Sequence, residues 1–337
     1  MTTSFDPDGD VLSGDTADIY FARTQTILRN EGLNPVVTME AFSNKNGILC
    51  GMKEVLALLA RVLPAESEVW ALEEGETISA KEVVLRITAP YRSFCLYETA
   101  FLGILAQQSG WATAARRCAE AAQGIPIISF GARHVHPKVA GRLEYAAIVG
   151  GFIGCATPAG AHLGDVSPSG TIPHALILIF GDTVEAIKAF DRHIPAEVNR
   201  IALVDTFKDE AEESLRVAAA LGEKLWGVRL DTPAERGRVT PDLVKEVRAR
   251  LDQAGYKHVK IVVSGGITEE RIRLFAAEGA PIDAFGVGSA VSSAPPIDFT
   301  ADIKAIEGKP VAKRGRIPGI VPNPRLRKID LTKSKSD

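Results

Sequence analysis

Short, unalternated apolar runs recur along the middle of the chain, and each gives way to a glycine, a charge or a histidine and then to a stretch with helical spacing. The runs cover residues 125–130, 146–151, 171–179, 201–204, 225–230, 259–263 and 284–287. Runs of this kind are typical of strands buried on both faces, and strands separated by helices predict parallel βαβ units. Seven in succession predict an α/β fold with an irregular seven-stranded βα barrel of the TIM type.

The same pattern divides the chain into three predicted parts. Residues 1–120 contain strand-like segments at 36–42, 68–72 and 83–87 and helical patterns at 53–63, 94–110 and 113–123, which predict an N-terminal α+β domain with linking helices. The barrel with a phosphate site is expected over residues 121–294. Residues 295–337, with Pro-Pro, Gly-Lys-Pro and a Lys/Arg-rich tail, are expected to form a solvated, partly disordered extension that packs back on the N-terminal domain.

Composition narrows the class of protein. The 337 residues are 46% hydrophobic and 24% charged with a net charge of -3, which gives no reason to expect a nucleic acid or a membrane surface as partner. The first residues lack the basic and apolar regions of a secretory signal, and no apolar stretch is long enough to span a bilayer, so we expect a cytoplasmic protein. Four scattered cysteines without Cys-x-x-Cys spacing indicate reduced thiols.

Candidate chemistry follows the predicted strands. In a parallel barrel the loops at the carboxyl ends of the strands meet at one mouth and hold the active site. The residues there are polar, charged or glycine: 131–134, 154–158, Pro173 with His174, Asp205 with Thr206, Arg229 with Asp231, 264–266, and Gly286 with Gly288. Anion binders, carboxylates and glycines together predict a site for a phosphorylated substrate.

Two glycine loops on successive late strands give the phosphate site its place. Ser264-Gly265-Gly266 follows an apolar run and precedes a helix start at Thr268, so backbone N–H groups are left to face an anion. Gly286 and Gly288 repeat the arrangement one strand later. Tight turns alone could also require one Gly-Gly pair, but two loops in succession favour phosphate binding.

Five segments, in this order, resemble nicotinate phosphoribosyltransferases of the shorter archaeal and bacterial form, which are type II phosphoribosyltransferases. They are SFGAR at 129–133, PSGTIPHAL at 168–176, VRLDTP at 228–233, VSGG at 263–266 and FGVG at 285–288. Upstream, DIYFART at 18–24 and the segment 97–110 are also similar to that family. The likeness extends from about residue 18 to residue 315.

The resemblance implies a reaction of NAD salvage in the pyridine nucleotide pathway. Nicotinate and phosphoribosyl pyrophosphate would give nicotinate mononucleotide and pyrophosphate, with Mg²⁺ as cofactor. The pyridine nitrogen would attack the anomeric carbon as pyrophosphate leaves, so the protein mainly orients its substrates and neutralises the departing charge.

The resemblance also implies residue roles. Gly265, Gly266, Gly286 and Gly288 would surround the 5'-phosphate, with Ser264 and Thr171 also binding substrate. Phe130 would stack on the pyridine ring, Arg133 would face the nicotinate carboxylate or a phosphate, and Arg229 would neutralise phosphate charge. Asp231, ranked ahead of Asp205, would hold the ribose hydroxyls or the metal. Tyr20 would reach a neighbour's active site, which implies a homodimer or a higher homo-oligomer.

Each role has a structural alternative that the residues leave open. Phe130 could belong to the core, and Arg133 and Arg229 could pair with structural carboxylates. Asp231 could cap a turn, and Asp205 could cap the helix expected near residue 208.

His174 is the most specific candidate. In the nicotinate phosphoribosyltransferase family that the chain resembles, some members couple ATP hydrolysis to the transfer, which is a ligase-type activity. The matching histidine is phosphorylated in those members, so the resemblance implies ATP as a candidate co-substrate. A lone histidine is otherwise commonly structural. His134 and His136 are weaker candidates for a metal on a strand, because Pro137 follows them and no third ligand is evident.

Two departures from the family leave the substrate open. His134 stands where the family often has a second arginine, and Ile153 stands where an acidic residue is expected. The alternatives are a quinolinate phosphoribosyltransferase, with Arg116 and Arg117 as extra cations, or a non-catalytic relative that binds phosphoribosyl compounds. An isomerase or aldolase is disfavoured because Lys260, the one well-placed barrel lysine, precedes its strand end.

Overall fold

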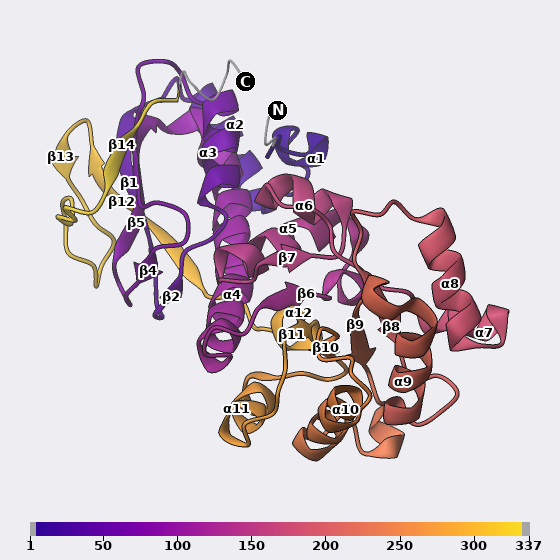
Figure 1. Ribbon diagram of the computed structural model, residues 1–337. Helices are drawn as coiled ribbons and strands as arrows, with labels where there is room; N and C mark the ends of the chain where they lie inside the picture. The colour runs from indigo at the N-terminus through magenta and orange to yellow at the C-terminus, as the bar shows by residue number, and fades with distance from the viewer. Residues whose placement is uncertain (1–4, 332–337) are drawn as a thin grey trace. The chain divides into compact units, whose positions relative to one another are not determined.

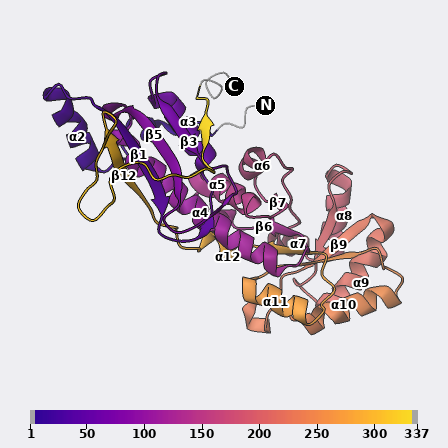
Figure 2. The same cartoon turned by 90° about the vertical axis from the view of Figure 1, so that its left-hand side faces the viewer.

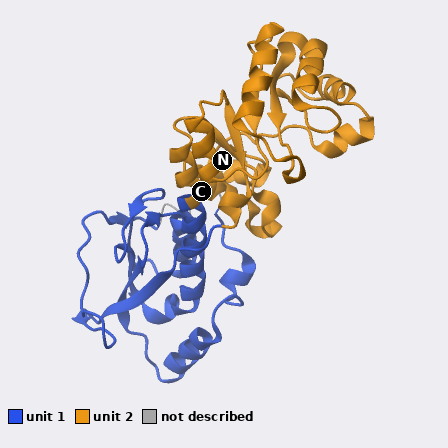
Figure 3. Cartoon of the chain, turned by 90° about the horizontal axis from the view of Figure 1, so that it is seen from below, with its two compact units in different colours: residues 1–113, 294–337 blue, residues 114–293 orange. Residues whose placement is uncertain are grey.

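The computed structural model describes residues 5–331, and the last six residues of the basic tail lie outside that range. The chain forms two compact units (Figure 3). Unit 1 combines residues 1–113 with 294–337, and unit 2 is residues 114–293. The division falls within helix α4, Glu98–Ala121.

Unit 1 is built on a six-stranded sheet in the order β13-β12-β1-β5-β3-β14, with antiparallel pairing at each step. Its strands are β1 (Val36–Ser43), β3 (Glu68–Ala71), β5 (Val83–Pro90), β12 (Phe299–Ile306), β13 (Lys309–Pro310) and β14 (Arg327–Ile329), and β2 (Gly47–Ile48) pairs separately with β4 (Thr77–Ile78). The expectation of a solvated extension is therefore wrong for residues 299–306, because Phe299 pairs with Ser43 and Ala305 with Thr38 inside the sheet.

The helices of unit 1 are α1 (Gly9–Leu12), α2 (Ile19–Asn30), α3 (Met52–Val62) and the first part of α4, with short 3-10 turns η1 (Tyr91–Ser93) and η2 (Cys95–Tyr97). Val55, Leu58 and Leu59 recur at helical spacing on α3 and are fully buried. Val55 and Leu59 belong to the core that the sheet shares with Phe101 and Leu105 of α4. Figure 1 shows α3 and α4 beside this sheet.

Helix α4 runs through the point at which the sequence predicts a stop. A side chain at Gly110 would collide with the carbonyl oxygen of Pro295, so this glycine provides close backbone packing rather than a helix end. The two helices predicted at 94–110 and 113–123 are consequently one.

Unit 2 is built on a six-stranded parallel sheet in the order β7-β6-β11-β10-β9-β8. The strands are β6 (Ile127–Ser129), β7 (Gly154–Cys155), β8 (Arg200–Leu203), β9 (Leu225–Leu230), β10 (Lys260–Val263) and β11 (Ala284–Val287). The seven-stranded barrel is wrong for the described residues. Apolar residues 146–149 end helix α5, and 174–179 lie in helix α7, because a short apolar run is equally compatible with a buried strand and a helix.

Helices connect the parallel strands, and polar caps begin several of them. Asp209, Thr240 and Thr268 accept backbone N–H bonds at the starts of α9, α10 and α11. The helices are α5 (Pro137–Val149), α6 (Pro158–Gly164), α7 (His174–Phe180), α8 (Thr183–His193), α9 (Glu210–Leu221), α10 (Pro241–Gln253), α11 (Glu269–Ala277) and α12 (Ser289–Ser292), with η3 (Ala132–His134), η4 (Gly222–Lys224) and η5 (Ala234–Arg236). Figure 2 shows α9, α10 and α11 following one another along one side of unit 2. Within residues 5–331, no helix has both the length and the apolar character needed to cross a bilayer.

Candidate active site

A cavity of about 390 Å³ opens at the carboxyl ends of the parallel strands in unit 2. The ends of β6, β9, β10 and β11 contribute to its wall, together with the segment 169–173. The predicted site residues that line it are Phe130, Arg133, Thr171, Arg229, Asp231, Ser264, Gly265, Gly266, Gly286 and Gly288. The fold therefore brings together residues that are more than 150 positions apart in the sequence.

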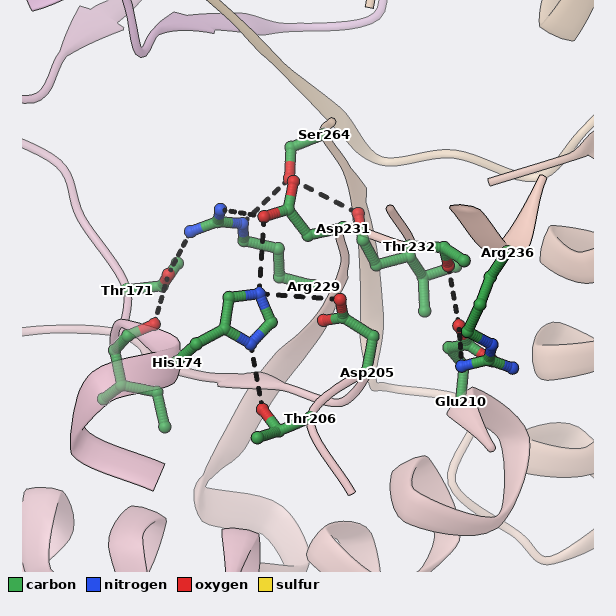
Figure 4. A network of polar contacts seen from close by, with 12 residues as sticks. Thr171, His174, Asp205, Thr206, Glu210, Arg229, Asp231, Thr232, Arg236 and Ser264 are labelled. Atoms are coloured by element: carbon green, nitrogen blue, oxygen red, sulfur yellow. Dashed lines mark hydrogen bonds and ion pairs between the residues drawn. The ribbon is translucent and has the colours of Figure 1, made fainter. Parts of the chain in front are cut away.

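His174 lies between two carboxylates. Its Nε2 atom is 3.5 Å from Oδ2 of Asp205 and 3.6 Å from Oδ2 of Asp231 (Figure 4). Its Nδ1 atom is 3.0 Å from the hydroxyl of Thr206. Carboxylates at Nε2 favour a hydrogen on that nitrogen, which leaves the lone pair of a neutral ring on Nδ1.

Asp205 is the buried member of this group, with a side chain that is 1% exposed against 40% for His174. Burial raises the pKa of its carboxyl to about 6, His174 lowers this pKa and Asp231 raises it. Its Oδ1 atom is buried without a hydrogen-bond partner in the described residues. A buried carboxylate oxygen without a donor favours the protonated form of the acid, in agreement with the raised pKa.

The guanidinium of Arg229 is held on three sides. Nε donates to Oγ of Ser264 at 2.9 Å, Nη1 to Oγ1 of Thr171 at 2.9 Å, and Nη2 to Oδ2 of Asp231 at 3.0 Å. Its central carbon lies 5.2 Å from the centroid of the Phe130 ring, a cation–π contact. Arg229 thus joins the strand ends of β6, β9 and β10 to the segment that precedes His174.

A second polar group supports the backbone next to Asp231. The hydroxyl of Thr232 donates to Oε1 of Glu210 at 2.7 Å, and Arg236 pairs with the same carboxylate at 3.3 Å. Glu210 is almost fully buried at the start of α9 (Figure 4). The side chain of Asp231 also accepts from Ser264 at 2.8 Å, so its position is fixed from two neighbouring strands.

The two glycine loops differ in what their glycines permit. Gly265 and Gly266 both have positive φ, +86° and +65°, and among the described residues the N–H groups of Gly265, Gly266 and Ile267 donate to no protein acceptor. Successive free N–H groups of this kind form an anion-binding concavity. A side chain at Gly286 would overlap the ring of Phe130, and one at Gly288 would come within 2.8 Å of the Phe130 carbonyl oxygen. Gly286 therefore makes room for Phe130.

The cations available to a substrate carboxylate are few. Arg133 lies on η3, is exposed, lines the cavity and forms no ion pair in the part of the chain that the structure describes. Arg116 instead donates to the carbonyl oxygen of Gly150, and Arg117 pairs with Glu269 at 3.4 Å. Neither lines the cavity.

Other predicted residues lie elsewhere. His134 packs beside Gly288 and lines the cavity. His136 is the N-cap of α5, accepting from the N–H of Lys138, so a metal held by these two histidines on a strand is wrong: neither residue is in a strand. Ile153 is 61% exposed and lies outside the cavity lining. Tyr20 lies on α2 of unit 1 and is 56% exposed, and its role at a neighbour's site stays a prediction.

The acidic residues of the site limit how a magnesium ion could be held. No group of three or more histidine, cysteine or acidic side chains among residues 5–331 could hold a metal by itself. Mg²⁺ in phosphate-transferring sites usually takes only one or two carboxylates and completes its coordination with water and substrate oxygens. Asp231 lines the cavity and could supply one such carboxylate, whereas Asp205 is buried behind it and does not line the cavity.

Thr206 is a site residue to which the sequence analysis gave no role. It follows Asp205 in the strand-end loop after β8, and its hydroxyl contacts His174. The dipeptide was visible as a strand-end signal, but a threonine's partner across a site 32 positions away cannot be read from spacing.

The parallel sheet, the glycine loops at its carboxyl edge and the acid–histidine group define a βα protein whose strand ends could hold an anion. Two family models match nearly the whole chain: the quinolinate phosphoribosyl transferase N-terminal domain over residues 18–109 and its C-terminal domain over residues 111–302. The chain belongs to the quinolinate phosphoribosyl transferase family.

Individual relatives carry two kinds of name. Nicotinate phosphoribosyltransferase pncB2 of Mycobacterium tuberculosis is 32% identical over 247 residues, covering 72% of this chain and 52% of that protein. Nicotinate phosphoribosyltransferase of Bacillus subtilis is 30% identical over 228 residues, 67% of this chain and 46% of that protein. The chain thus spans about half the length of these two relatives. A crystal structure of nicotinate-nucleotide pyrophosphorylase from Pyrococcus furiosus is 43% identical, with a TM-score of 0.85, and the match covers 95% of this chain and 82% of that one.

Proposed function

We propose that this protein transfers the phosphoribosyl group of phosphoribosyl pyrophosphate to nicotinate, giving nicotinate mononucleotide and pyrophosphate. The observation that carries the choice of nicotinate is the cation content of the cavity. Of the two arginines that line it, Arg229 is held by Thr171, Asp231 and Ser264, and Arg133 is unpaired within the described residues. One unpaired guanidinium suits one carboxylate.

The remaining residues suit the transfer. The N–H groups of Gly265, Gly266 and Ile267 would bind the 5'-phosphate. The carboxylates of Asp205 and Asp231 would hold the ribose hydroxyls or Mg²⁺. Bound Mg²⁺ would supply charge neutralisation for the pyrophosphate. Arg229, which contacts the face of the Phe130 ring, would hold that ring against the pyridine ring of the substrate. The positive charge of Arg229 would also stabilise the departing pyrophosphate.

Quinolinate is the second candidate substrate, and the description of the matching family favours it. Quinolinate carries two adjacent carboxylates and must lose one as CO₂ to give the same mononucleotide. The cations suggested for the extra carboxylate are engaged elsewhere in unit 2, Arg116 by a backbone carbonyl and Arg117 by Glu269. We therefore place nicotinate first.

We further propose that His174 accepts the γ-phosphate of ATP through Nδ1, which would make the activity of the ligase type. The carboxylates at Nε2 support this choice of nitrogen, because they favour the tautomer whose lone pair is on Nδ1. Thr206 would give up its contact with Nδ1 as the N–P bond forms and ADP leaves.

A product assay tests these proposals together. The protein is incubated with phosphoribosyl pyrophosphate, Mg²⁺ and nicotinate, nicotinamide or quinolinate, with and without ATP, and the mononucleotide, CO₂ and ADP are measured. Mononucleotide from nicotinate without CO₂ supports the first candidate. Release of CO₂ together with mononucleotide from quinolinate would support quinolinate as the substrate instead. If no base gives a product, the protein binds phosphoribosyl compounds without catalysing the transfer. Light scattering on the same preparation tests the expectation of a homodimer or a higher homo-oligomer.

A further inference from the structure

Arg238 stands out in unit 2 as a charged residue that the proposed reaction has not used. It lies in the loop between β9 and α10, directly after Gly237, and its side chain is exposed. Within the described part of the chain it has no hydrogen bond or ion pair from its guanidinium. An arginine with no carboxylate partner, close to a phosphate loop, is a candidate ligand contact.

The guanidinium of Arg238 lies against the glycine loop. A Cβ atom built on Gly266 would collide with Nη1 of Arg238, so the arginine occupies the space that a side chain at position 266 would fill. Gly266 itself lines the cavity, and the N–H groups of Gly265, Gly266 and Ile267 are without protein acceptors. A positive charge and a set of N–H groups without protein acceptors therefore meet at Gly266.

The backbone of Arg238 adopts a conformation that is unfavourable for its residue type. Its φ is +65°, following +88° at Gly237, in a turn where the carbonyl oxygen of Pro233 accepts from the N–H of both Arg236 and Arg238. A left-handed residue other than glycine or asparagine costs roughly 1 kcal/mol. The side chain that leaves this turn lies against Gly266. The unfavourable backbone conformation thus accompanies a position of the guanidinium beside the glycine loop.

A second arginine increases the positive charge. Arg271, in the first turn of α11, donates through Nη2 to the carbonyl oxygen of Val239 at 2.6 Å, and its buried Nε has no hydrogen-bond partner. Burial lowers the pKa of Arg271, and the charge of Arg238 lowers it further. The nearby Glu269 is paired with Arg117 and Arg273, so it does not offset Arg238.

We propose that Arg238 binds the phosphate monoester of the substrate at the Gly265–Gly266 loop. Resting on the proposed function, this ligand is the 5'-phosphate of phosphoribosyl pyrophosphate. The guanidinium donates to phosphate oxygens from the β9–α10 side of the loop, and the backbone N–H groups donate from the other. A phosphate dianion relieves the repulsion between Arg238 and Arg271 and gives the guanidinium its partner.

Ribose 5-phosphate is the direct probe, because it carries the monoester without pyrophosphate or base. Calorimetric titration compares the wild type with Arg238→Gln, Arg238→Lys and Arg250→Gln. Arg250, on the adjacent helix α10, is exposed and paired with Glu246, so its variant removes one positive charge of unit 2 away from the loop. Arg238→Gln is expected to raise Kd about tenfold, Arg238→Lys less, and Arg250→Gln less than twofold.

Steady-state kinetics give the second measurement. Arg238→Gln should raise KM for phosphoribosyl pyrophosphate about tenfold and leave KM for nicotinate unchanged. If Arg238→Gln is unstable, Arg238→Lys carries the same comparison. An unchanged Kd in a folded Arg238 variant, an equal loss in Arg250→Gln, or no binding of ribose 5-phosphate by the wild type overturns the inference. If the wild type binds ribose 5-phosphate through Arg238 but forms no mononucleotide, the proposed function fails and the phosphate contact stands.

Discussion

His174 covers Asp205: its Nε2 lies 3.5 Å from the Asp205 carboxylate, and the imidazole is 40% exposed where the carboxylate is 1% exposed. The exposed imidazole is therefore the contact between the buried carboxylate and the solvent-accessible surface. A change in the charge of Asp205 therefore acts directly on the hydrogen on Nε2 of His174.

Replacing Asp205 by asparagine should stabilise the folded protein at neutral pH. The pKa of Asp205 is about 6 in the folded protein, above the ordinary value of 3.8. Between pH 3.8 and about pH 6, this carboxyl is therefore protonated in the folded state and ionised in the unfolded state. Stability from this group is present below about pH 4 and is lost as pH rises to about 6. Asp205→Asn should thus match the wild type near pH 4 and exceed it by about 1–3 kcal/mol at pH 8. Urea unfolding at both pH values measures this, and a variant that is less stable at pH 8 contradicts it.

Replacing Asp231 by asparagine should impair catalysis more than stability. The substitution keeps the size and shape of the side chain but removes the charge that we assign to ribose or Mg²⁺, and its amide oxygen can accept from only one of Ser264 and Arg229. We expect kcat to fall roughly 100-fold and the Mg²⁺ requirement to rise, with a small change in Tm. Asp242→Asn, at an exposed position on α10, is the matched control. A large loss of Tm with normal activity in the folded fraction would instead identify Asp231 as a turn cap.

Replacing His174 by alanine should separate basal transfer from ATP coupling. The imidazole is half-exposed and bonded only to side chains, so its loss should cost little stability. We expect basal mononucleotide formation to persist and the stimulation by ATP to disappear, along with acid-labile label from γ-labelled ATP. His193→Ala, at the end of α8, serves as control. Absence of label and of any ATP effect in the wild type would leave His174 as a positioning residue for Asp205 and Asp231.

Gly286→Ala should displace Phe130. A side chain at position 286 overlaps the Phe130 ring, which also carries the Arg229 contact, so we expect a loss of about 1–3 kcal/mol of stability and at least about tenfold in activity. The double variant with Phe130→Ala should lose less stability than the sum of the two single variants. Gly103→Ala, an exposed helical glycine with free space around it, should instead stabilise the protein. Additive losses would show that the ring is not the obstacle.

Periodicity predicted five of the unit 2 strands because β6, β8, β9, β10 and β11 are short apolar runs that end in chemistry-bearing residues. It failed at residues 146–151 and 171–179, which also are short and apolar. For the first, the informative signal was upstream, where His136 and Pro137 form an N-cap and first helical residue. For the second, Leu178, Ile179 and Phe180 are exposed, so neither helix nor strand burial explains their apolar character.

The candidate site was predictable at strand ends and much less so elsewhere. Residues such as Asp231 and Ser264 directly follow a strand, and parallel strands place such residues together. Asp205 was ranked below Asp231 because burial and a missing hydrogen-bond partner are properties of the folded chain. Arg238 was out of reach for the same reason, since its contact with Gly266 depends on a left-handed turn seven residues after Asp231.

The pairing of β12 with β1 has a consequence for synthesis of the chain. Strand β1 is synthesised before unit 2, but its second neighbour, Phe299–Ile306, is synthesised after unit 2. Until then one edge of β1 exposes unpaired N–H and C=O groups over eight residues that include Val37, Met39 and Ala41. Unit 2 can complete its own sheet during that interval, because all six of its strands lie between residues 127 and 287. Strand β1 therefore precedes unit 2 in the sequence but obtains its second neighbour only after unit 2 has been synthesised.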